Sequence, residues 1–473
     1  MNRTTLLLAS LLTSTLLVGC SDDDDDTTPA AVFDSFPAEG ALLPFQVLRD
    51  DLIDGKTQQS FEVRNGGFGS AMTAHPSSPT RFYALTDRGP NASFTGDHGK
   101  GKVFPTPDYT PRIGLFEVQS DGVVTHLNSI LLKRPDGSHI TGLPNTSALG
   151  GTGETPYHAS GAPVLVDDSQ PYDETTNPLR LDDYGLDGEG LVALSDGTFW
   201  VSDEYGPHMV HFDAEGREIG RINPFADDSR VSLNLPAEFA NRRANRGMEG
   251  LAVTPDETTL VGIMQSTMYN PGSAVKDLDI TRLVTVNLET GAIGQYLYRQ
   301  QKTQNSNSEI LALSDTEFLV LERDGSFLYG GPNGAGAAKP DAQKQVYRID
   351  LSSGTNLETI ALNGDLAQNP ALGLTLAGKT LEEVVLEQGW GALTAAGIVP
   401  VSKSLVVDMV VEVNYPHDKM EGLWLIDNQR LGVLNDDDFA TWSSGGVLEQ
   451  KMLDANTVDG NRLYIINADL SVD

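Results

Sequence analysis

The chain has 473 residues, of which 66 are acidic and 32 are lysine or arginine, so its formal charge is −34. Hydrophobic residues make up 39% of it, which is enough for a large core and excludes wholesale disorder. An excess of negative charge this large repels nucleic acid and anionic membranes as main partners, and it favours cationic ligands such as metal ions.

The first 35 residues have the pattern of an export segment. Arg3 precedes an apolar stretch from Leu6 to Val18, and Gly19-Cys20 follows. This order is that of a secretory signal, and it resembles a bacterial lipobox in which Cys20 becomes the lipidated first residue. We therefore expect a signal peptide over residues 1–19, an acidic tether over 20–35, and lipid anchoring to the outer membrane of a bacterial envelope, on its periplasmic or surface face. The alternative is a plain signal peptide with an incidental cysteine.

Residues 36–473 are expected to form one repetitive domain. Each repeat has an acidic residue, a short apolar strand, a turn, a second apolar strand and a polar cluster. Complete copies begin at Glu189, Glu249, Glu309 and Glu421, and a degenerate copy without the leading glutamate begins at Gly69. Such repeats, with four strands per unit, predict an all-β fold of the β-propeller type.

The spacing of the repeats sets the expected number of blades. Glu189, Glu249 and Glu309 are 60 residues apart, whereas the intervals from Gly69 to Glu189 and from Glu309 to Glu421 are 120 and 112 residues. Each long interval has room for a degenerate blade or an insertion. We expect six blades, with five or seven as alternatives, a loop insertion over 150–176 and a short helix over 381–388.

The repeats also predict a cluster of carboxylates. In an antiparallel hairpin, the start of the first strand and the end of the second lie at the same edge. In a propeller these edges meet at one mouth of the central channel, where crowded carboxylates raise each other's pKa values or bind cations. Such oxygen ligands suit Ca²⁺, and no spacing of His or Cys suggests zinc. The candidate metal ligands are Glu189, Asp203, Glu204, Glu249, Glu309, Glu322, Glu421, Asp436 and Asp437. The alternative is that each glutamate only caps strand amides of its own blade.

Basic residues occur at the same hairpin edges. Cations beside a ring of carboxylates and Ca²⁺ would suit an anionic substrate such as a phosphate ester, because guanidinium groups form forked hydrogen bonds to phosphate oxygens. Ion pairing that only balances charge is the alternative. A histidine near the same edge could act as an acid or base, or be a surface loop residue. The candidate catalytic residues are Glu249, His208, Arg246, Arg88, Arg323 and Lys419.

Several motifs resemble one family. Gly185-Leu-Asp-Gly-Glu-Gly190, Asp203-Glu-Tyr-Gly-Pro207 and Asn245-Arg-Gly-Met-Glu-Gly250 are similar to motifs of the phytase-like family of bacterial secreted proteins, which is described as having esterase-like activity. The resemblance implies a β-propeller related to calcium-dependent phytases, in which Ca²⁺ binds phosphate and activates water. It also implies metal-side roles for Glu189, Asp203, Glu204, Glu249, Glu309 and Glu421. The chain departs from the family pattern at Asp437, where asparagine is expected.

Together these features predict a lipid-anchored, Ca²⁺-dependent phosphoric ester hydrolase of the phytase, phosphatase or phosphodiesterase kind. We expect a monomer that acts on an anionic small-molecule ester, contacts the membrane only through its anchor and binds no nucleic acid. A lactonase-like propeller, in which Ca²⁺ polarises a carbonyl, is a second enzyme hypothesis. A non-catalytic surface binding or scaffold propeller is the third.

Overall fold

A computed structural model describes residues 36–472 of the protein. The expected signal peptide, the tether and Cys20 lie outside these residues. Within them, no helix combines the length and the apolar character that crossing a bilayer requires.

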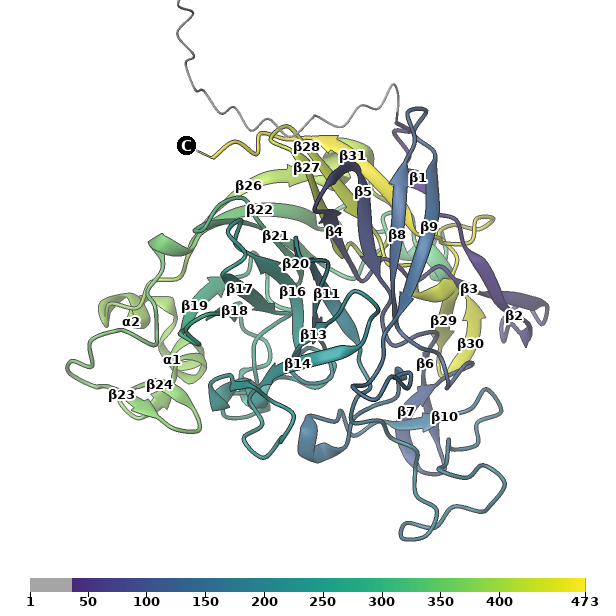
Figure 1. The fold of residues 1–473 in the computed structure, drawn as a ribbon, viewed down its shortest axis with the longest axis horizontal. Helices are drawn as coiled ribbons and strands as arrows, with labels where there is room; N and C mark the ends of the chain where they lie inside the picture. Colours follow the sequence, from purple (N-terminus) through teal and green to yellow (C-terminus); the bar gives the residue numbers. More distant parts are fainter. Residues whose placement is uncertain (1–35, 473) are drawn as a thin grey trace, which may run out of the picture.

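Five sheets, here called blades 1 to 5, contain most of the strand residues of the described chain (Figure 1). Blade 1 contains β4 (Ala71–His75), β5 (Ser78–Leu85), β8 (Arg112–Val118) and β9 (Val124–Leu131). Blade 2 contains β11 (Gly188–Ala193), β12 (Phe199–Asp203), β13 (Met209–Phe212), β14 (Glu218–Asn223) and β15 (Leu233–Asn234). Blade 3 contains β16 (Met248–Val253), β17 (Thr259–Met264), β18 (Ile280–Asn287) and β19 (Ile293–Arg299). Blade 4 contains β20 (Ser306–Ala312), β21 (Glu317–Arg323), β22 (Lys344–Asp350) and β26 (Ser402–Asp408). Blade 5 contains β27 (Gly422–Asp427), β28 (Arg430–Leu434), β31 (Arg462–Asn467) and β1 (Ala41–Leu42).

The first strands of the blades surround a common axis. β4, β11, β16, β20 and β27 contact one another in a closed cycle, and all five line an apolar channel of about 190 Å³. Leu191, Leu251 and Ile310 are among its lining residues. A ring of sheets around a channel is the architecture of a β-propeller, so the predicted fold class is confirmed.

The described residues form five such sheets, one fewer than the expected six. The two long intervals between repeats contain insertions in place of a further blade. One insertion forms the small sheet of β6 (Ala92–Gly96), β7 (Gly99–Val103) and β10 (Thr155–Tyr157). The other forms β23 (Leu366–Asn369), β24 (Gly373–Leu376) and β25 (Lys379–Thr380), followed by α1 (Leu381–Gln388) and α2 (Trp390–Ala395).

Helix α1 coincides with the predicted helix over 381–388. Thr380 and Glu383 form a capping box at its start, in which each side chain bonds the other's main-chain amide. Two hairpins lie outside the blades, β2 (Gln46–Ile53) with β3 (Ser60–Asn65) and β29 (Thr441–Ser444) with β30 (Val447–Gln450). The remaining helix of the α type is α3 (Met409–Val413), and short 3₁₀ turns include 147–149, 237–241 and 438–440.

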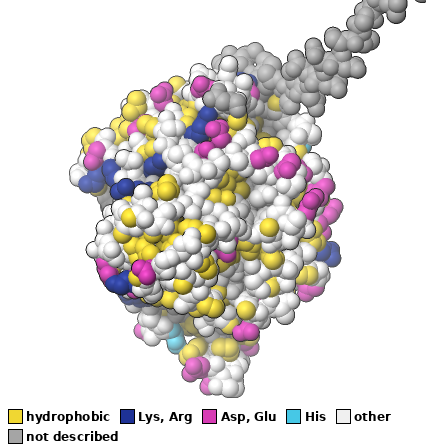
Figure 2. All heavy atoms as spheres, turned by 90° about the vertical axis from the view of Figure 1, so that its left-hand side faces the viewer, with side chains coloured by type: hydrophobic (Ala, Val, Ile, Leu, Met, Phe, Trp, Pro, Cys, Tyr) yellow, Lys and Arg dark blue, Asp and Glu magenta, His cyan; other side chains and the backbone are white. Residues whose placement is uncertain are grey.

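Blade 5 joins the two ends of the described chain. β1 pairs antiparallel with β31, with Ala41 opposite Leu463. Trp424 of this blade is 1% exposed, and its ring centroid lies 5.1 Å from that of Phe82 in blade 1. The core therefore lies between blades, and pairing plus packing close the ring. On the face in Figure 2, acidic side chains are scattered among neutral ones, so the negative charge is not concentrated on that face.

Candidate functional site

The repeated glutamates lie where the first strands depart from regular pairing. In blade 2, Gly188 faces Asp203 and Gly190 faces Ser202, so Glu189 is an extra residue with no opposite partner. Blade 3 has a similar register shift between Met248 and Leu251, which contains Glu249. β-bulges bend a strand locally and redirect a side chain, and this explains how the same buried glutamate position leaves the regular pairing at the start of successive first strands.

The glycine after the glutamate has a separate role. A Cβ atom on Gly190 would lie 2.6 Å from the carbonyl oxygen of Glu249 in the next blade. A Cβ atom on Gly250 would overlap the amide nitrogen of Ile310 in the blade after that. The Glu-Gly motif therefore combines a carboxylate at the mouth with a close approach of neighbouring first strands.

Three carboxylates meet in blade 2. Asp187, Glu189 and Glu204 are all buried, and each offers an oxygen atom that lies within 4.8 Å of the others. Burial raises the pKa of Asp187 to about 7, with Glu204 adding to the rise and Arg88 opposing it. Burial also raises the pKa of Glu189 well above its ordinary value, and the charges of Glu249 and Asp187 raise it further. Burial and the mutual repulsion of the carboxylates therefore disfavour the fully ionised cluster, and Arg88 offsets only part of this effect.

Further glutamates continue this cluster towards the axis. The amide of Gln265 donates to Glu204, at 3.0 Å, and to Glu249. Burial and the neighbouring Glu204 raise the pKa of Glu249 well above the ordinary value. Glu309 lies 1% exposed, accepts from the amides of Leu251 at 3.3 Å and of Ile310 at 2.9 Å, and keeps one oxygen without a partner among the described residues.

Three predicted basic residues lie at the same mouth, and each is paired with acids. Arg88 lies 3.1 Å from Asp187, 3.5 Å from Glu154 and 3.9 Å from Glu204. Arg323 pairs with Glu421. Lys419 lies 2.6 Å from Asp436, 2.8 Å from Asp438 and 3.8 Å from Glu421. These cations hold the carboxylates in place and offset part of their charge.

The segment after β28 forms an unusual turn at the mouth. Asp438, Phe439 and Ala440 have φ values of +51°, +58° and +57°, a left-handed conformation that non-glycine residues seldom adopt in succession. Asp438 lies 2.8 Å from Lys419 and 2.6 Å from Lys451, and these two cations lower its pKa although burial opposes them. Ion pairing and the buried ring of Phe439 hold the strained turn.

The mouth contains an inner cavity of about 390 Å³. It lies between the blade ends, the β6–β7 hairpin and the β29–β30 hairpin. Its charged lining consists of Asp87, Glu189, Glu204, Asp418, Asp438, Arg88, Lys102, Arg323 and Lys419.

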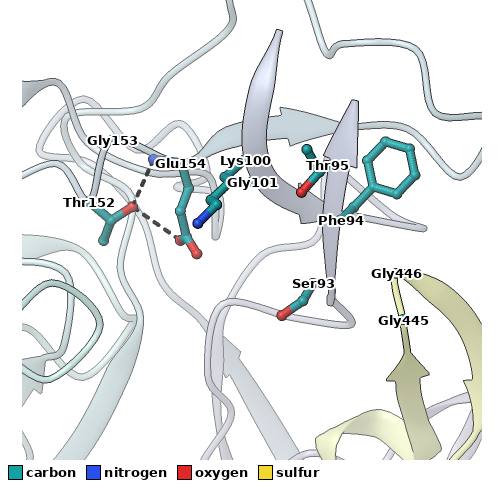
Figure 3. A pocket seen from close by; sticks show the side chains of 10 residues that line it. All are labelled: Ser93, Phe94, Thr95, Lys100, Gly101, Thr152, Gly153, Glu154, Gly445 and Gly446. Carbon is teal, nitrogen blue, oxygen red and sulfur yellow. Dashed lines mark hydrogen bonds between the residues drawn. The ribbon is translucent and has the colours of Figure 1, made fainter. Parts of the chain in front are cut away.

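An outer pocket of about 610 Å³ adjoins this cavity, and Ser93 lines both (Figure 3). In Figure 3 the side chains of Lys100 and Glu154 lie on one side of Ser93, and the Gly445–Gly446 turn lies on the other. Together the two spaces form a polar cleft of the size that holds small-molecule ligands.

Nine predicted site residues do not line the inner cavity: Asp203, His208, Arg246, Glu249, Glu309, Glu322, Glu421, Asp436 and Asp437. Asp203 is fully buried, and its carboxylate accepts from the amides of Asp187 at 2.8 Å and Gly206 at 3.2 Å, so it shapes the loop between them. Asp437 likewise accepts from the amide of Phe439, at 3.0 Å. Glu322 points away from the mouth.

Two partners of the Glu322 carboxylate come from blades 3 and 4. Its carboxylate accepts from the Tyr298 hydroxyl at 2.7 Å and lies 2.9 Å from Lys403. Glu309 and Glu322, which are both predicted metal ligands, do not face each other across the hairpin, because Asn307 lies opposite Glu322 and Glu309 lies opposite Leu321. A register shift of one residue in β20 accounts for this offset.

His208 is placed inside the protein and not in the cleft. Its side chain is fully buried, and its Nε2 lies 3.1 Å from the carbonyl oxygen of Leu149. Burial and Arg221 hold its pKa well below the ordinary value. Arg246 also lies outside the cavity lining, where its guanidinium contacts the Ser306 hydroxyl at 3.5 Å.

Five residues that the structure brings into the site are not among the predicted ones: Asp87, Lys102, Asp187, Asp418 and Asp438. Asp187 lies two positions before Glu189 in the same motif, so the alternation of an extended strand could have indicated it. Lys102 lies on β7, in the insertion that folds over the mouth, and no pattern in the sequence pointed to it. Asp418 and Asp438 join the lining in the same way, through loops that only the fold brings there.

Comparisons with known proteins agree with the sequence motifs. The model of the phytase-like family, described as "Esterase-like activity of phytase", matches residues 63–439, which is more than half of the chain. An uncharacterized secreted protein of Arthroderma benhamiae is 28% identical over 238 residues, and the match covers 42% of this chain and 45% of that protein. This chain thus matches less than half the length of that relative.

Three solved structures that match over most of the chain have low identity and low TM-scores. The aldose sugar dehydrogenase of Streptomyces coelicolor has 10% identity and a TM-score of 0.30, covering 93% of this chain and 96% of the other. A putative glycosidase from Bacteroides thetaiotaomicron has 8% identity and a TM-score of 0.32, covering 92% and 97%. Virginiamycin B lyase of Staphylococcus aureus has 11% identity and a TM-score of 0.25, covering 82% and 96%. The family match rests on the residues themselves, and by it this chain belongs to the phytase-like family.

Proposed function

We propose that the protein is a Ca²⁺-dependent hydrolase of phosphoric esters. The observation that carries this proposal is the buried trio of Asp187, Glu189 and Glu204, two members of which line a cavity that also contains basic side chains. The family description and the acidic cluster support a metal-dependent, esterase-like activity, and the choice of Ca²⁺ and of phosphoric esters is our inference.

The donor atoms suit a hard divalent cation. Asp187, Glu189 and Glu204 would hold the ion, and all three carboxylates are buried, with Oδ2 of Asp187 in an ion pair with Arg88 at 3.1 Å. Ca²⁺ takes six to eight oxygen ligands in irregular geometry, so carboxylates plus water would satisfy it. When bound, such an ion polarises a phosphoryl oxygen and lowers the pKa of water.

The chain's own residues would prepare the cavity for an anion. Arg88 contacts both Asp187 and Glu204, which fixes the position of two carboxylates of the trio. The lining contains five acidic and four basic side chains, so its formal charge is −1 when all are ionised. One divalent cation would change that charge to +1. We therefore expect an anionic substrate to bind the protein only when the metal is present.

The proposal is tested with a substrate panel. Phosphomonoesters, phosphodiesters and lactones are assayed with Ca²⁺ and with EDTA, using the wild type, Glu189→Gln and Glu289→Gln. Glu289 is exposed in the turn between β18 and β19 and serves as a matched control. We expect Ca²⁺-dependent cleavage of a phosphoric ester, a loss of at least about 100-fold in kcat for Glu189→Gln, and no change for Glu289→Gln.

Other outcomes identify the alternatives. Turnover of lactones alone would support the lactonase-like hypothesis. If Ca²⁺ raises the melting temperature through Glu189 and no substrate is turned over, the protein is a binding or scaffold propeller with a structural ion. Full hydrolytic activity in EDTA would contradict the proposed role of the cluster.

We further propose that the protein lies in the bacterial cell envelope and is anchored through Cys20. The signal pattern and the secreted relative support export. A Cys20→Ser variant should move from the membrane fraction to the soluble fraction of cells grown with labelled palmitate, and should lose the label. Equal membrane association of both proteins would contradict the anchor.

A further inference from the structure

The basic residues of the inner cavity differ in how they are paired. Arg88, Arg323 and Lys419 each lie within ion-pair distance of at least one carboxylate. Lys102 is the fourth basic residue of the lining, and its side chain forms no hydrogen bond or ion pair with any part of the chain that the structure describes. Its positive charge is therefore available to a ligand.

The backbone under Lys102 is fixed. β7 is the middle strand of its small sheet, paired with β6 on one side and β10 on the other, and Lys102 lies opposite Ser93 and Pro156. A Cβ atom at Gly101 would overlap the carbonyl oxygen of Thr155, so glycine there permits the close contact between β7 and β10. The side chain thus extends into the cavity from a rigid base.

The surroundings of Lys102 favour the binding of an anion to its ammonium group. Burial lowers its pKa below the ordinary value, the nearby Arg88 lowers it further, and the acidic residues around the trio oppose the effect. An ammonium group in this position lacks both full hydration and a carboxylate partner. An oxyanion in the cavity would supply the missing partner.

The position of the outer pocket indicates how a ligand in the cleft would be oriented. Ser93 lies opposite Lys102 across the β6–β7 pair and lines both spaces, so a molecule held at Lys102 can continue past Ser93 into the outer pocket. That pocket offers the ring of Phe94 and the hydroxyl groups of Thr95 and Thr152. These groups suit an organic residue with hydroxyl or apolar parts.

We propose that Lys102 binds the phosphoryl oxygens of the substrate in the inner cavity, while the alcohol part of the ester occupies the outer pocket. This inference rests on the proposed function. Lys102 would be a substrate-binding residue supplied by the insertion, and not by the repeated blade motif.

Binding of inorganic phosphate tests the inference without requiring turnover. Its Kd is measured by calorimetry at saturating Ca²⁺ for the wild type, Lys102→Gln, Lys102→Arg and Lys100→Gln. Lys100 lies on the same face of β7, two residues away, and lines only the outer pocket. We expect Lys102→Gln to raise the Kd at least about tenfold, Lys102→Arg to restore most of the affinity, and Lys100→Gln to have no effect.

The affinity for Ca²⁺ and the melting temperature show whether a variant has lost only phosphate binding or has also lost folded structure. Neither should fall in Lys102→Gln, because the side chain has no hydrogen-bond or ion-pair partner among the described residues, and its loss removes a positive charge from the neighbourhood of the acidic trio. In the wild type, phosphate should also protect Lys102 from acetylation, mapped by mass spectrometry, while Lys100 reacts freely. This second measurement needs no folded variant.

Two results would overturn the inference: an unchanged phosphate Kd in Lys102→Gln, or equal loss of affinity in Lys100→Gln. The inference and the proposed function can fail separately. If phosphate binding depends on Lys102 but no ester is hydrolysed, the anion site stands and the hydrolase does not. If esters are hydrolysed equally well by Lys102→Gln, the hydrolase stands and the role of Lys102 does not.

Discussion

The acidic trio should make the stability of the protein depend jointly on pH and on metal. The pKa of Asp187 rises from its ordinary value of 3.8 to about 7 in the folded protein. The folded state therefore holds this proton more strongly than the unfolded state. Without metal, the free energy of unfolding should fall as the pH rises from about 4 to about 7, by about 4 kcal/mol for Asp187 alone. Glu189, whose pKa is also raised, should add to this loss.

Bound Ca²⁺ should remove this loss, because it favours the ionised carboxylates. Urea unfolding midpoints are measured from pH 4 to pH 8, in EDTA and in Ca²⁺. We expect the two curves to agree near pH 4 and to separate as the pH rises. The difference between them isolates the metal-binding carboxylates from other groups that titrate in the same range.

The Glu189→Gln variant tests how much one carboxylate of the trio contributes to the dependence of stability on pH and metal. Glu189 forms no hydrogen bond or ion pair within the described structure, so the substitution removes a negative charge and leaves no cation unpaired. We expect the variant to be more stable than the wild type in EDTA at pH 8, and to gain much less from Ca²⁺. The reasoning would be refuted if the variant were less stable in EDTA, or if the wild-type pH profile were the same with and without metal.

Three further substitutions test individual parts of the structure. His208→Gln should lower the free energy of unfolding by about 1–3 kcal/mol and leave the pH profile of kcat/KM unchanged, since the residue is buried away from the cleft; a displaced pH profile would contradict its placement. Arg323→Gln should cost about 3–5 kcal/mol in urea unfolding because it leaves the buried Glu421 with only the more distant Lys419, at 3.8 Å, as a cationic partner, and adding Glu421→Gln should recover part of that loss; additive effects of the two changes would show that the pair is not coupled. Gly250→Ala should cost about 1–3 kcal/mol through its contact with the next first strand, whereas Gly336→Ala, which has open space around it, should be neutral in thermal unfolding; equal effects would argue against the close approach of first strands.

The local pattern of the sequence was sufficient for the fold class and for part of the site. Strand alternation and the Glu-Gly repeats depend on residues close together in the chain, so they predicted the propeller and the convergence of Glu189 and Glu204. Helix α1 was likewise predicted from its own short segment. The same reasoning could not count the blades, because an interval of 120 residues fits either a degenerate blade or an insertion.

Tertiary structure decided which carboxylates meet and which cation remains free. One-residue register shifts in the hairpins direct Glu322 towards Tyr298 and Lys403 and away from the mouth, and such shifts have no signature in a single repeat. Lys102 reaches the cavity because an insertion folds over blades that are distant from it in the chain. The sequence therefore determined the repeated carboxylates, and the packing of non-repeated segments against them determined their charge balance, their pKa values and the space open to a ligand.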